Sequence, residues 1–217
     1  MKYTPPLHSS LDILFEDEFL LVLNKPSGLL SVPGRGEDKQ DCLISRAQSQ
    51  YSDALIVHRL DMSTSGLMIL ARGKEMERYL SILFQQRNVG KKYIAVVDGH
   101  VKPDFGEIDL PLITDWPNRP KQKMDFESGK HSQTKYSVLS YEKENDTTRI
   151  ELIPLTGRTH QLRVHMQSIE HAILGDDLYA NKEAIAKAPR LLLHACYLSF
   201  QHPITDECLQ FNSEPEF

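Results

Sequence analysis

Short apolar runs, each bounded by turn-forming residues, recur along this chain and restrict its fold more than any other feature. Residues 20–23 and 67–71 are two such runs, and residues 197–200 form another near the C-terminal end. Runs of this kind are typical of β-strands joined by short turns. The regular βαβ alternation of a doubly wound fold is missing. The pattern therefore predicts an α+β protein with a mixed, mainly antiparallel sheet and a few flanking helices and loops.

The spacing of apolar residues places the individual elements. Two hairpins are predicted, formed by residues 13–15 with 20–23 and by residues 136–139 with 149–153. Helices are predicted over residues 41–50, over residues 74–86 and from Thr159 onward. Residues 106–126 are predicted to be irregular with short strands, and closing strands are predicted at 191–193, 197–200 and 208–211.

Composition limits the class of protein. The chain has 217 residues, of which 40% are hydrophobic, as expected for a packed globular core. No apolar run approaches the roughly 20 residues needed to cross a bilayer, and the N-terminus lacks the features of a signal peptide. A cytoplasmic protein with no membrane partner is therefore expected. The three cysteines are scattered and lack metal-ligand spacing, so neither a disulfide framework nor a metal site is expected.

One short segment concentrates positive charge in an otherwise acidic protein. The net charge of −5 argues weakly against a nucleic-acid partner, but RNA binding requires only a local basic surface. Residues 116–123 contain the only tryptophan, three cations and no acid, and the candidate RNA contacts are Trp116, Arg119, Lys121 and Lys123. An exposed loop of ordinary charge would have the same composition.

Residues 58–66 form a densely polar segment between two apolar strands. They supply the basic pair His58 and Arg59, the carboxylate of Asp61, three hydroxyl groups and a terminal glycine. Hydroxyls and backbone N–H groups of this kind can fix a carboxylate or bind a phosphate. A tight turn in which Asp61 caps local backbone groups explains the same residues.

A second polar segment begins the helix predicted from Thr159. Helical spacing places His160 and Arg163 one turn apart and away from Leu162. An arginine held beside an aspartate keeps that carboxylate ionised and fixes its direction. A solvated basic helix face is the alternative. The two histidines of this segment do not have the spacing of a helical zinc pair.

Tyr93 lies in a predicted strand directly after two lysines. A tyrosine with flanking cations is suited to stacking on a base beside phosphate contacts. The alternative is a core tyrosine beside lysines whose charged ends reach solvent. The chain has no Walker loop, dinucleotide fingerprint, nucleophile elbow or zinc-deaminase signature, so chemistry without a cofactor is expected.

Taken together, these segments resemble the motifs of the RluA family of pseudouridine synthases. His58-Arg59-Leu60-Asp61, followed by Thr64-Ser65-Gly66, resembles the catalytic motif of that family. The other motifs are matched, in the family's order, by residues 25–28, 92–95, 157–165 and 192–195. The resemblance implies the pseudouridine synthase fold and an isomerase that converts uridine to pseudouridine in RNA.

The resemblance also implies a role for particular residues. Asp61 corresponds to the catalytic aspartate, Arg163 to the arginine that forms a salt bridge with it, and Tyr93 to the tyrosine that stacks on the target base. Arg59 corresponds to the arginine that enters the RNA where the flipped uridine was, and Leu192 to part of the apolar wall near the base. The further substrate-binding candidates are His58, Arg158, His160, Trp116, Arg119, Lys121 and Lys123.

Residues 109–112, 115–123 and 189–195 further resemble the short member of the family that acts on both 23S rRNA and the tRNA anticodon arm. Little sequence precedes the first motif, so a single catalytic domain over residues 1–217 without an N-terminal S4 domain is expected. A monomer that flips its target base out of an RNA stem-loop is expected as well.

Two alternatives from other classes fit part of the pattern. A nucleoside or glycoside hydrolase would also use Asp61, but such an enzyme usually places a second acid nearby. An RNA-binding module without catalysis would explain the basic segments but not the set of Asp61, Arg163 and Tyr93. Two chemical routes also remain open, since an ionised carboxylate can attack C1′ or remove a 2′ proton.

Overall fold

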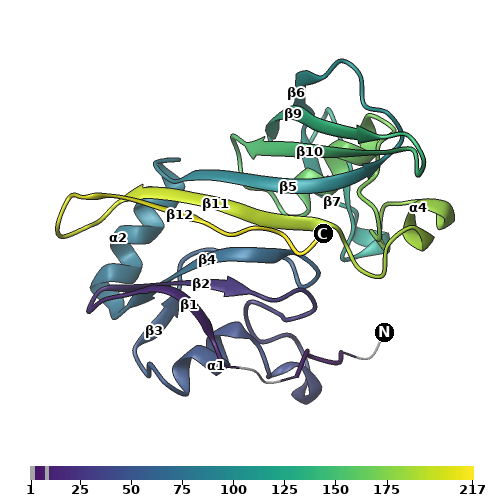
Figure 1. Ribbon diagram of the computed structural model, residues 1–217. Coiled ribbons are helices and arrows are strands. Elements are labelled where there is room, and N and C mark those ends of the chain that lie inside the picture. The colour runs from purple at the N-terminus through teal and green to yellow at the C-terminus, as the bar shows by residue number, and fades with distance from the viewer. Residues whose placement is uncertain (1–2, 8–9) are drawn as a thin grey trace. The chain divides into compact units, whose positions relative to one another are not determined.

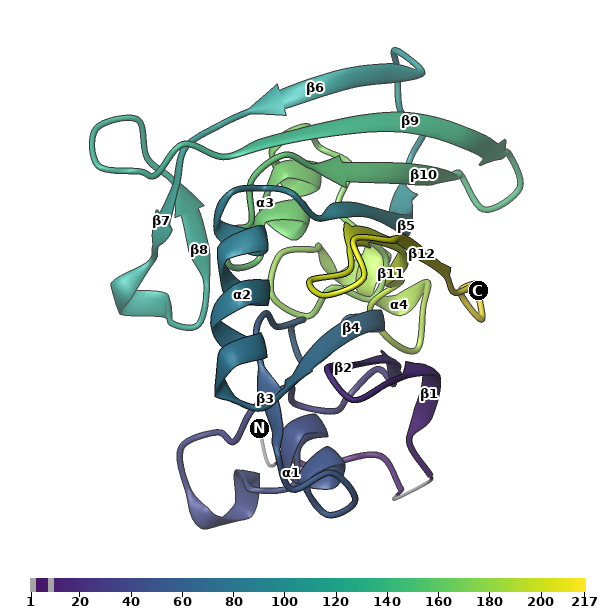
Figure 2. The same ribbon diagram turned by 90° about the vertical axis from the view of Figure 1, so that its left-hand side faces the viewer.

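The structure, a computed structural model, describes residues 3–7 and 10–217 and divides the chain into two compact units. Unit 1 contains Met1–Lys91 and Ala195–Glu216, and unit 2 contains Lys92–His194 and Phe217. Figures 1 and 2 label the elements of both units in two views.

Unit 1 is built around an antiparallel arrangement of strands with two short helices and one longer one. Its elements are β1 (Asp12–Glu16), β2 (Leu20–Lys25), the 3-10 helix η1 (Glu37–Lys39), α1 (Leu43–Gln48), β3 (Ala54–Ile56), β4 (Ser65–Arg72), α2 (Lys74–Gln85), most of β11 (Leu193–Gln201) and β12 (Cys208–Asn212). The strand order is β1-β2-β4-β11, with β3 also pairing with β4 and β12 with β11.

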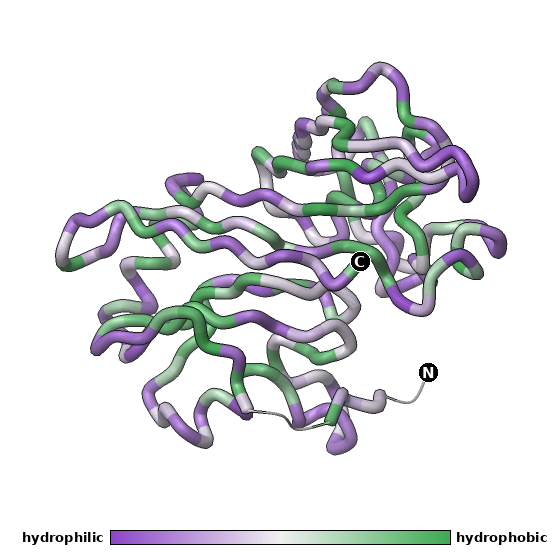
Figure 3. Tube along the Cα trace, viewed as in Figure 1, coloured by the Kyte–Doolittle hydropathy of each residue, from purple (hydrophilic) through white to green (hydrophobic). Residues whose placement is uncertain are grey.

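The core of unit 1 forms where the apolar strands β2 and β4 meet the apolar face of α2. Leu20 and Leu67 from the strands pack with Met76 and Leu80 from the helix, and all four are buried. Figure 3 shows hydrophobic and hydrophilic segments alternating along the trace, and the β1–β2 connection is acidic, with Glu16, Asp17 and Glu18. Asp17 illustrates this separation, because its carboxylate accepts the backbone N–H groups that close the β1–β2 turn.

Unit 2 holds a second group of antiparallel strands, two α-helices and one 3-10 helix. Its elements are most of β5 (Gly90–Asp98), β6 (Phe105–Asp109), β7 (Leu112–Thr114), the 3-10 helix η2 (Trp116–Asn118), β8 (Gln122–Met124), β9 (Gln133–Glu142), β10 (Thr147–Pro154), α3 (Gln161–Ser168) and α4 (Lys182–Ala186). The strand order is β5-β10-β9-β6, and β7 and β8 form a separate two-stranded hairpin. Figure 2 shows this hairpin set apart from the longer strands of the unit.

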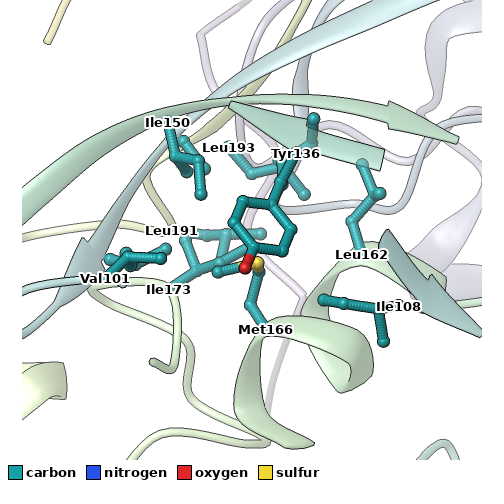
Figure 4. Packing of buried hydrophobic residues seen from close by; sticks show 12 residues of the cluster. Val101, Ile108, Tyr136, Ile150, Leu162, Met166, Ile173, Leu191 and Leu193 are labelled. Carbon is teal, nitrogen blue, oxygen red and sulfur yellow. The ribbon is translucent and has the colours of Figure 1, made fainter. Parts of the chain in front are cut away.

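The core of unit 2 lies between its strands and α3. Figure 4 shows Leu162 and Met166 from the helix close to Ile150 and Tyr136 from the strands. The same spacing that buries these apolar residues turns other positions of α3 toward the segment that follows it. The core therefore fixes the direction in which the polar residues of α3 point.

The α+β class is confirmed, and so are both predicted hairpins, which are β1–β2 and β9–β10. The helix predicted over residues 74–86 is also present as α2. Two of the predicted closing strands are wrong as separate elements, because residues 193–201 form the single strand β11. The helix expected from Thr159 begins two residues later at Gln161, because His160 has a left-handed backbone with φ of 54°.

The helix α4 was missed by the sequence analysis. It has only five residues, too few for a repeating apolar pattern. Its start is nevertheless marked, because the side chain of Asn181 accepts a hydrogen bond from the backbone N–H of Ala184 at 2.8 Å. This is an N-cap signal of the ordinary kind.

Candidate active site

Asp61 lies in the connection between β3 and β4 of unit 1. The backbone carbonyl of Asp61 accepts a hydrogen bond from the N–H of Thr64 at 3.1 Å, so residues 61–64 form a tight turn. The Asp61 residue is half-buried, whereas Arg59 is exposed. The turn and the candidate site are thus the same feature, since a tight turn leaves its first side chain at the surface of the fold.

The segment that follows β2 holds this turn from both sides. Ser27 donates from its hydroxyl to the carbonyl of Ser63 at 2.7 Å. Ser31, which is buried, donates to the carbonyl of Leu60 at 2.7 Å and accepts from the N–H of Leu60 at 3.2 Å. The backbone is therefore fixed immediately before and shortly after Asp61.

Lys25 supplies a buried positive charge beneath the same turn. Its ammonium group donates to the carbonyls of Leu29 at 2.8 Å, Pro26 at 2.9 Å and Met62 at 3.1 Å. Burial lowers the pKa of Lys25 from 10.5 to about 7, while the negative charge of Asp61 acts in the opposite direction. The interaction with Asp61 indicates that the carboxylate and the ammonium lie within electrostatic reach of each other.

His58 has contacts that support the turn from within unit 1. Its Nε2 accepts the backbone N–H of Ile69 at 2.9 Å, and its ring stacks on Phe84 with centroids 4.3 Å apart. Burial, with a smaller effect from Lys91, lowers the pKa of His58 from 6.5 to about 3. His58 is therefore a neutral acceptor at physiological pH, and these contacts fit a residue that holds the loop better than one that binds phosphate.

Gly66 ends the polar segment because no side chain fits there. Its φ is +115°, and a Cβ atom would lie 2.4 Å from the carbonyl oxygen of Ala195 on β11. Both the backbone conformation and the close approach of β11 require glycine. The glycine of the motif thus sets how closely β4 and β11 pack at the end of the Asp61 turn.

Arg163 lies on α3 of unit 2 and is buried, with 3% of the residue exposed. Its Nε and Nη2 donate to the two carboxylate oxygens of Asp176 at 2.8 and 2.6 Å, and Nη2 also lies 3.3 Å from Asp177. This bidentate pair fixes the plane of the guanidinium. The interpretation of this face of α3 as a solvated basic face is therefore wrong for Arg163, because a solvated arginine would not be enclosed and paired.

His160 and Arg163 lie together, as their spacing predicted, and the residue that joins them is Tyr179. His160 Nδ1 lies 2.7 Å from the Tyr179 hydroxyl, and the Arg163 guanidinium lies over the Tyr179 ring, 5.2 Å from its centroid. The same hydroxyl accepts the backbone N–H of Gln122 at 2.7 Å. Gln122 begins β8, so Tyr179 connects α3 with the β7–β8 hairpin.

Tyr93 and Leu192 lie at the margin of the unit 2 core. Tyr93 is on β5 opposite Leu152 of β10, and both Tyr93 and Leu192 pack half-buried against the core cluster. Leu192 also lines a cavity of about 540 Å³ within the unit. Arg158 is exposed, and its Nε donates to the carbonyl of His131 at 3.2 Å.

The β7–β8 hairpin presents the four candidate residues of the basic segment. Trp116 is 65% exposed, and the guanidinium of Arg119 lies 4.7 Å from the centre of its ring. Lys121 is half-buried, whereas Lys123 is exposed and lies 3.6 Å from the carboxylate of Asp125. The hairpin therefore combines an aromatic surface with three cations, although one of them is partly neutralised.

The candidate residues form one group in each unit. His58, Arg59 and Asp61 lie together in unit 1, and the remaining candidates lie in unit 2. Sequence analysis missed the supporting roles of Lys25, Ser27, Ser31, Asp176 and Tyr179. The sequence signal for Asp176 is that residues 176–177 are the first acidic pair after the helix that holds Arg163.

Neither a metal-binding cluster nor a membrane-spanning helix occurs among the described residues. Residues 3–7 and 10–217 contain no group of three or more His, Cys, Asp or Glu side chains that could hold a metal ion. Across the same residues, no helix has the length and apolarity needed to cross a membrane.

Comparison with known proteins yields relatives over the whole length. Residues 19–168 match the family model described as RNA pseudouridylate synthase. The Dual-specificity RNA pseudouridine synthase RluA of Escherichia coli (strain K12) is 51% identical over 216 residues, covering 100% of this chain and 98% of the relative. The enzyme of the same name from Vibrio parahaemolyticus serotype O3:K6 is 54% identical over 206 residues, covering 94% and 82%.

Solved structures give the same family at lower identity. Human RNA Pseudouridylate Synthase Domain Containing 1 matches with a TM-score of 0.79 and 28% identity, covering 96% of this chain and 84% of that one. Human RNA Pseudouridylate Synthase Domain Containing 4 matches with a TM-score of 0.74 and 28% identity, covering 94% and 89%.

Proposed function

The chain belongs to the RNA pseudouridine synthase family, and from this membership we propose that Asp61 isomerises uridine to pseudouridine in RNA stem-loops. The enzyme is an RNA isomerase, so neither a hydrolase nor a binding module without catalysis accounts for it. The observation that carries the residue assignment is the Asp61 turn, whose backbone is held on both sides by the hydroxyls of Ser27 and the buried Ser31 in the preceding segment.

The reaction requires one ionised carboxylate. The C1′–N1 bond breaks, the base turns, C5 bonds to C1′, N1 gains a proton and the C5 proton leaves. An ionised Asp61 can begin this sequence by attack on C1′ or by removal of a 2′ proton. The Asp61 carboxylate lies within electrostatic reach of the Lys25 ammonium, and a neighbouring positive charge favours the charged form of a carboxylate.

We assign to Arg163 the role of partner for the Asp61 carboxylate. A guanidinium has two edges that can bind a carboxylate, and Asp176 takes the edge formed by Nε and Nη2. The pairing with Asp176 fixes the plane of the guanidinium and therefore the direction in which its second edge points. Burial of Arg163 supports this role, because a fixed and desolvated cation orients a carboxylate better than a mobile one.

The target base is proposed to stack on Tyr93, with Leu192 forming part of the apolar wall. Tyr93 and Leu192 both lie half-buried at the edge of the unit 2 core, where a ring and an aliphatic side chain can be covered by a base. Flipping a uridine out of its stem-loop costs a few kcal/mol. Arg59 is exposed on the Asp61 turn and is proposed to fill the gap that the uridine leaves.

The proposed substrates are stem-loops of 23S rRNA and of the tRNA anticodon arm. Support comes from the similarity of this chain, at 51% and 54% identity, to relatives whose name states dual specificity. The β7–β8 hairpin adds an exposed aromatic ring beside cations, a combination suited to unpaired RNA. We further propose that residues 1–217 act as a single catalytic domain, as a monomer and in the cytoplasm.

The experiment uses purified protein and two transcripts, a tRNA anticodon stem-loop and a 23S rRNA stem-loop, each labelled with tritium at C5 of uridine. Formation of pseudouridine releases the tritium, because C5 exchanges its proton for the bond to C1′. Tritium release with no free uracil is the expected result for both RNAs. Release from neither transcript would overturn the substrate assignment, and free uracil would indicate hydrolysis instead.

A further inference from the structure

Tyr179 joins three parts of unit 2 that the proposed function uses. Its hydroxyl accepts the backbone N–H of Gln122 on β8 and lies 2.7 Å from Nδ1 of His160 at the start of α3. Its ring lies beneath the guanidinium of Arg163 at 5.2 Å. One side chain therefore contacts the basic hairpin through its polar end and the buried arginine through its face.

The position of Tyr179 is itself set by the acid that binds Arg163. Asp176 Oδ1 accepts the backbone N–H groups of Leu178 at 3.0 Å and of Tyr179 at 3.2 Å. The same oxygen accepts from Arg163 Nη2 at 2.6 Å. The turn that presents the tyrosine and the ion pair that fixes the arginine thus share one carboxylate, which is 1% exposed.

From these contacts we infer that Tyr179 is a positioning residue that couples the β7–β8 hairpin to Arg163. Its hydroxyl anchors the hairpin whose cations are proposed to contact the RNA, and its ring fixes the plane of the Arg163 guanidinium. The inference rests on the proposed function, since it assigns how RNA contact and carboxylate orientation are linked within the same site.

The two ends of the tyrosine predict two separable effects. Tyr179→Phe keeps the ring and removes the hydroxyl, so the hairpin loses an anchor while the face against Arg163 remains. Loss of the hydrogen bond between the Tyr179 hydroxyl and the hairpin is expected to raise KM for RNA about five- to tenfold and to leave kcat nearly unchanged. Tyr179→Leu also removes the ring, and loss of a desolvated cation–π contact corresponds to a further fall of about tenfold in kcat.

The experiment measures kcat and KM by tritium release from the anticodon stem-loop for wild type, Tyr179→Phe and Tyr179→Leu. The matched control is Tyr141→Phe, which removes a hydroxyl bonded to Asp146 at 2.8 Å elsewhere in unit 2. The thermal midpoint of each variant is recorded so that kcat refers to folded enzyme. The control is expected to have wild-type KM and kcat.

The expected result is a KM effect for the phenylalanine variant and an additional kcat effect for the leucine variant. Wild-type KM in Tyr179→Phe would overturn the hairpin link, and equal kcat in the two variants would overturn the arginine link. A uniform loss in both variants that follows their thermal midpoints would show a structural role only and would also overturn the inference. If wild type and Tyr141→Phe are both inactive, the proposed function fails, which separates the two failures.

Discussion

At the scale of single residues, the segment that follows β2 fixes the backbone on both sides of Asp61. Ser31 binds both backbone groups of Leu60, and Ser27 binds the carbonyl of Ser63. Lys25 adds a buried ammonium that binds the carbonyl of the residue after Asp61. The position of the proposed catalytic carboxylate therefore depends on backbone contacts made by neighbouring residues.

Ser31→Ala tests this dependence. The substitution leaves the buried N–H and C=O of Leu60 without their partner and is expected to lower the free energy of unfolding by about 1–3 kcal/mol. Because the Asp61 turn loses its support, kcat is expected to fall by about ten- to a hundredfold. Tritium release and urea unfolding measure the two effects. The control is Ser49→Ala. Ser49 is exposed, and its hydroxyl donates to the carbonyl of Arg46 at 2.7 Å. Equal kcat in the two variants would contradict the account.

The lowered pKa of His58 makes the free energy of unfolding depend on pH. Its pKa is about 3 in the folded protein and 6.5 without the fold, so the unfolded chain takes up the proton first as pH falls. The stabilisation is complete above pH 6.5 and is lost as pH falls toward 3, which amounts to roughly 2–3 kcal/mol by about pH 4.5. His58→Gln keeps an acceptor for Ile69 and does not titrate, so its stability should fall less over this range. Parallel loss of stability in the two proteins, measured by urea unfolding at each pH, would contradict the buried neutral state.

Gly66→Ala tests the close approach of β4 and β11. The Cβ atom of the alanine would lie 2.4 Å from the backbone of Ala195, and the alanine residue would have to adopt a φ of +115°. The expected loss in the free energy of unfolding is roughly 3 kcal/mol, because overpacking adds to the cost of the backbone conformation. Gly73→Ala, with φ of +80° and no atom within 4 Å, should lose only about 1 kcal/mol. Equal losses, measured by urea unfolding, would show that β11 yields to the added methyl group.

At the scale of elements, the β7–β8 hairpin is the part of unit 2 that carries the basic segment. Its strands have three residues each, so the hairpin depends on contacts with the rest of the unit, among them the bond from Gln122 to Tyr179. Its exposed Trp116 and Arg119 form a cation–aromatic pair. These features suit an element that is held at its base and meets RNA at its tip.

The hairpin predicts a change in the salt dependence of RNA binding. Lys121→Ala, Lys123→Ala and Arg119→Ala are each expected to weaken binding and to reduce the slope of log Kd against log salt by about one. Binding of the anticodon stem-loop at several salt concentrations measures the slope. Lys143→Ala is the control, because Lys143 is exposed between Glu142 and Glu144 at the β9–β10 connection, where RNA is repelled. An unchanged slope in all three hairpin variants would place the RNA contacts elsewhere.

The elements also show how far sequence reasoning reaches. Both predicted hairpins and α2 could be derived from the sequence, because each contains an apolar run or an apolar spacing typical of its element. The continuity of β11 could not be derived in this way. Residues 191–193 and 197–200 are both apolar whether they belong to one strand or to two. The start of α3 depends on the left-handed backbone of His160, and a histidine is too weak a sequence signal to place that conformation, although it adopts it more often than most residues do.

At the scale of the whole molecule, the family could be identified from sequence because its motifs are local, each formed by a few neighbouring residues. The supporting contacts could not, because they join distant segments: Ser31 with Leu60 in one unit and Tyr179 with Gln122 in the other. Arg163 is the clearest case. Its place on α3 followed from helical spacing, but its burial and its pairing with Asp176 depend on a turn that apolar periodicity does not predict.

The isomerisation is proposed to depend on the Asp61 carboxylate, and Asp61→Asn is the substitution that examines this role alone. The amide keeps the size of the side chain but removes the charge, so it can neither attack C1′ nor accept a proton. We predict no detectable tritium release from the anticodon stem-loop, with Kd for that RNA within about twofold of wild type. Tritium release at the wild-type rate by Asp61→Asn would contradict the account.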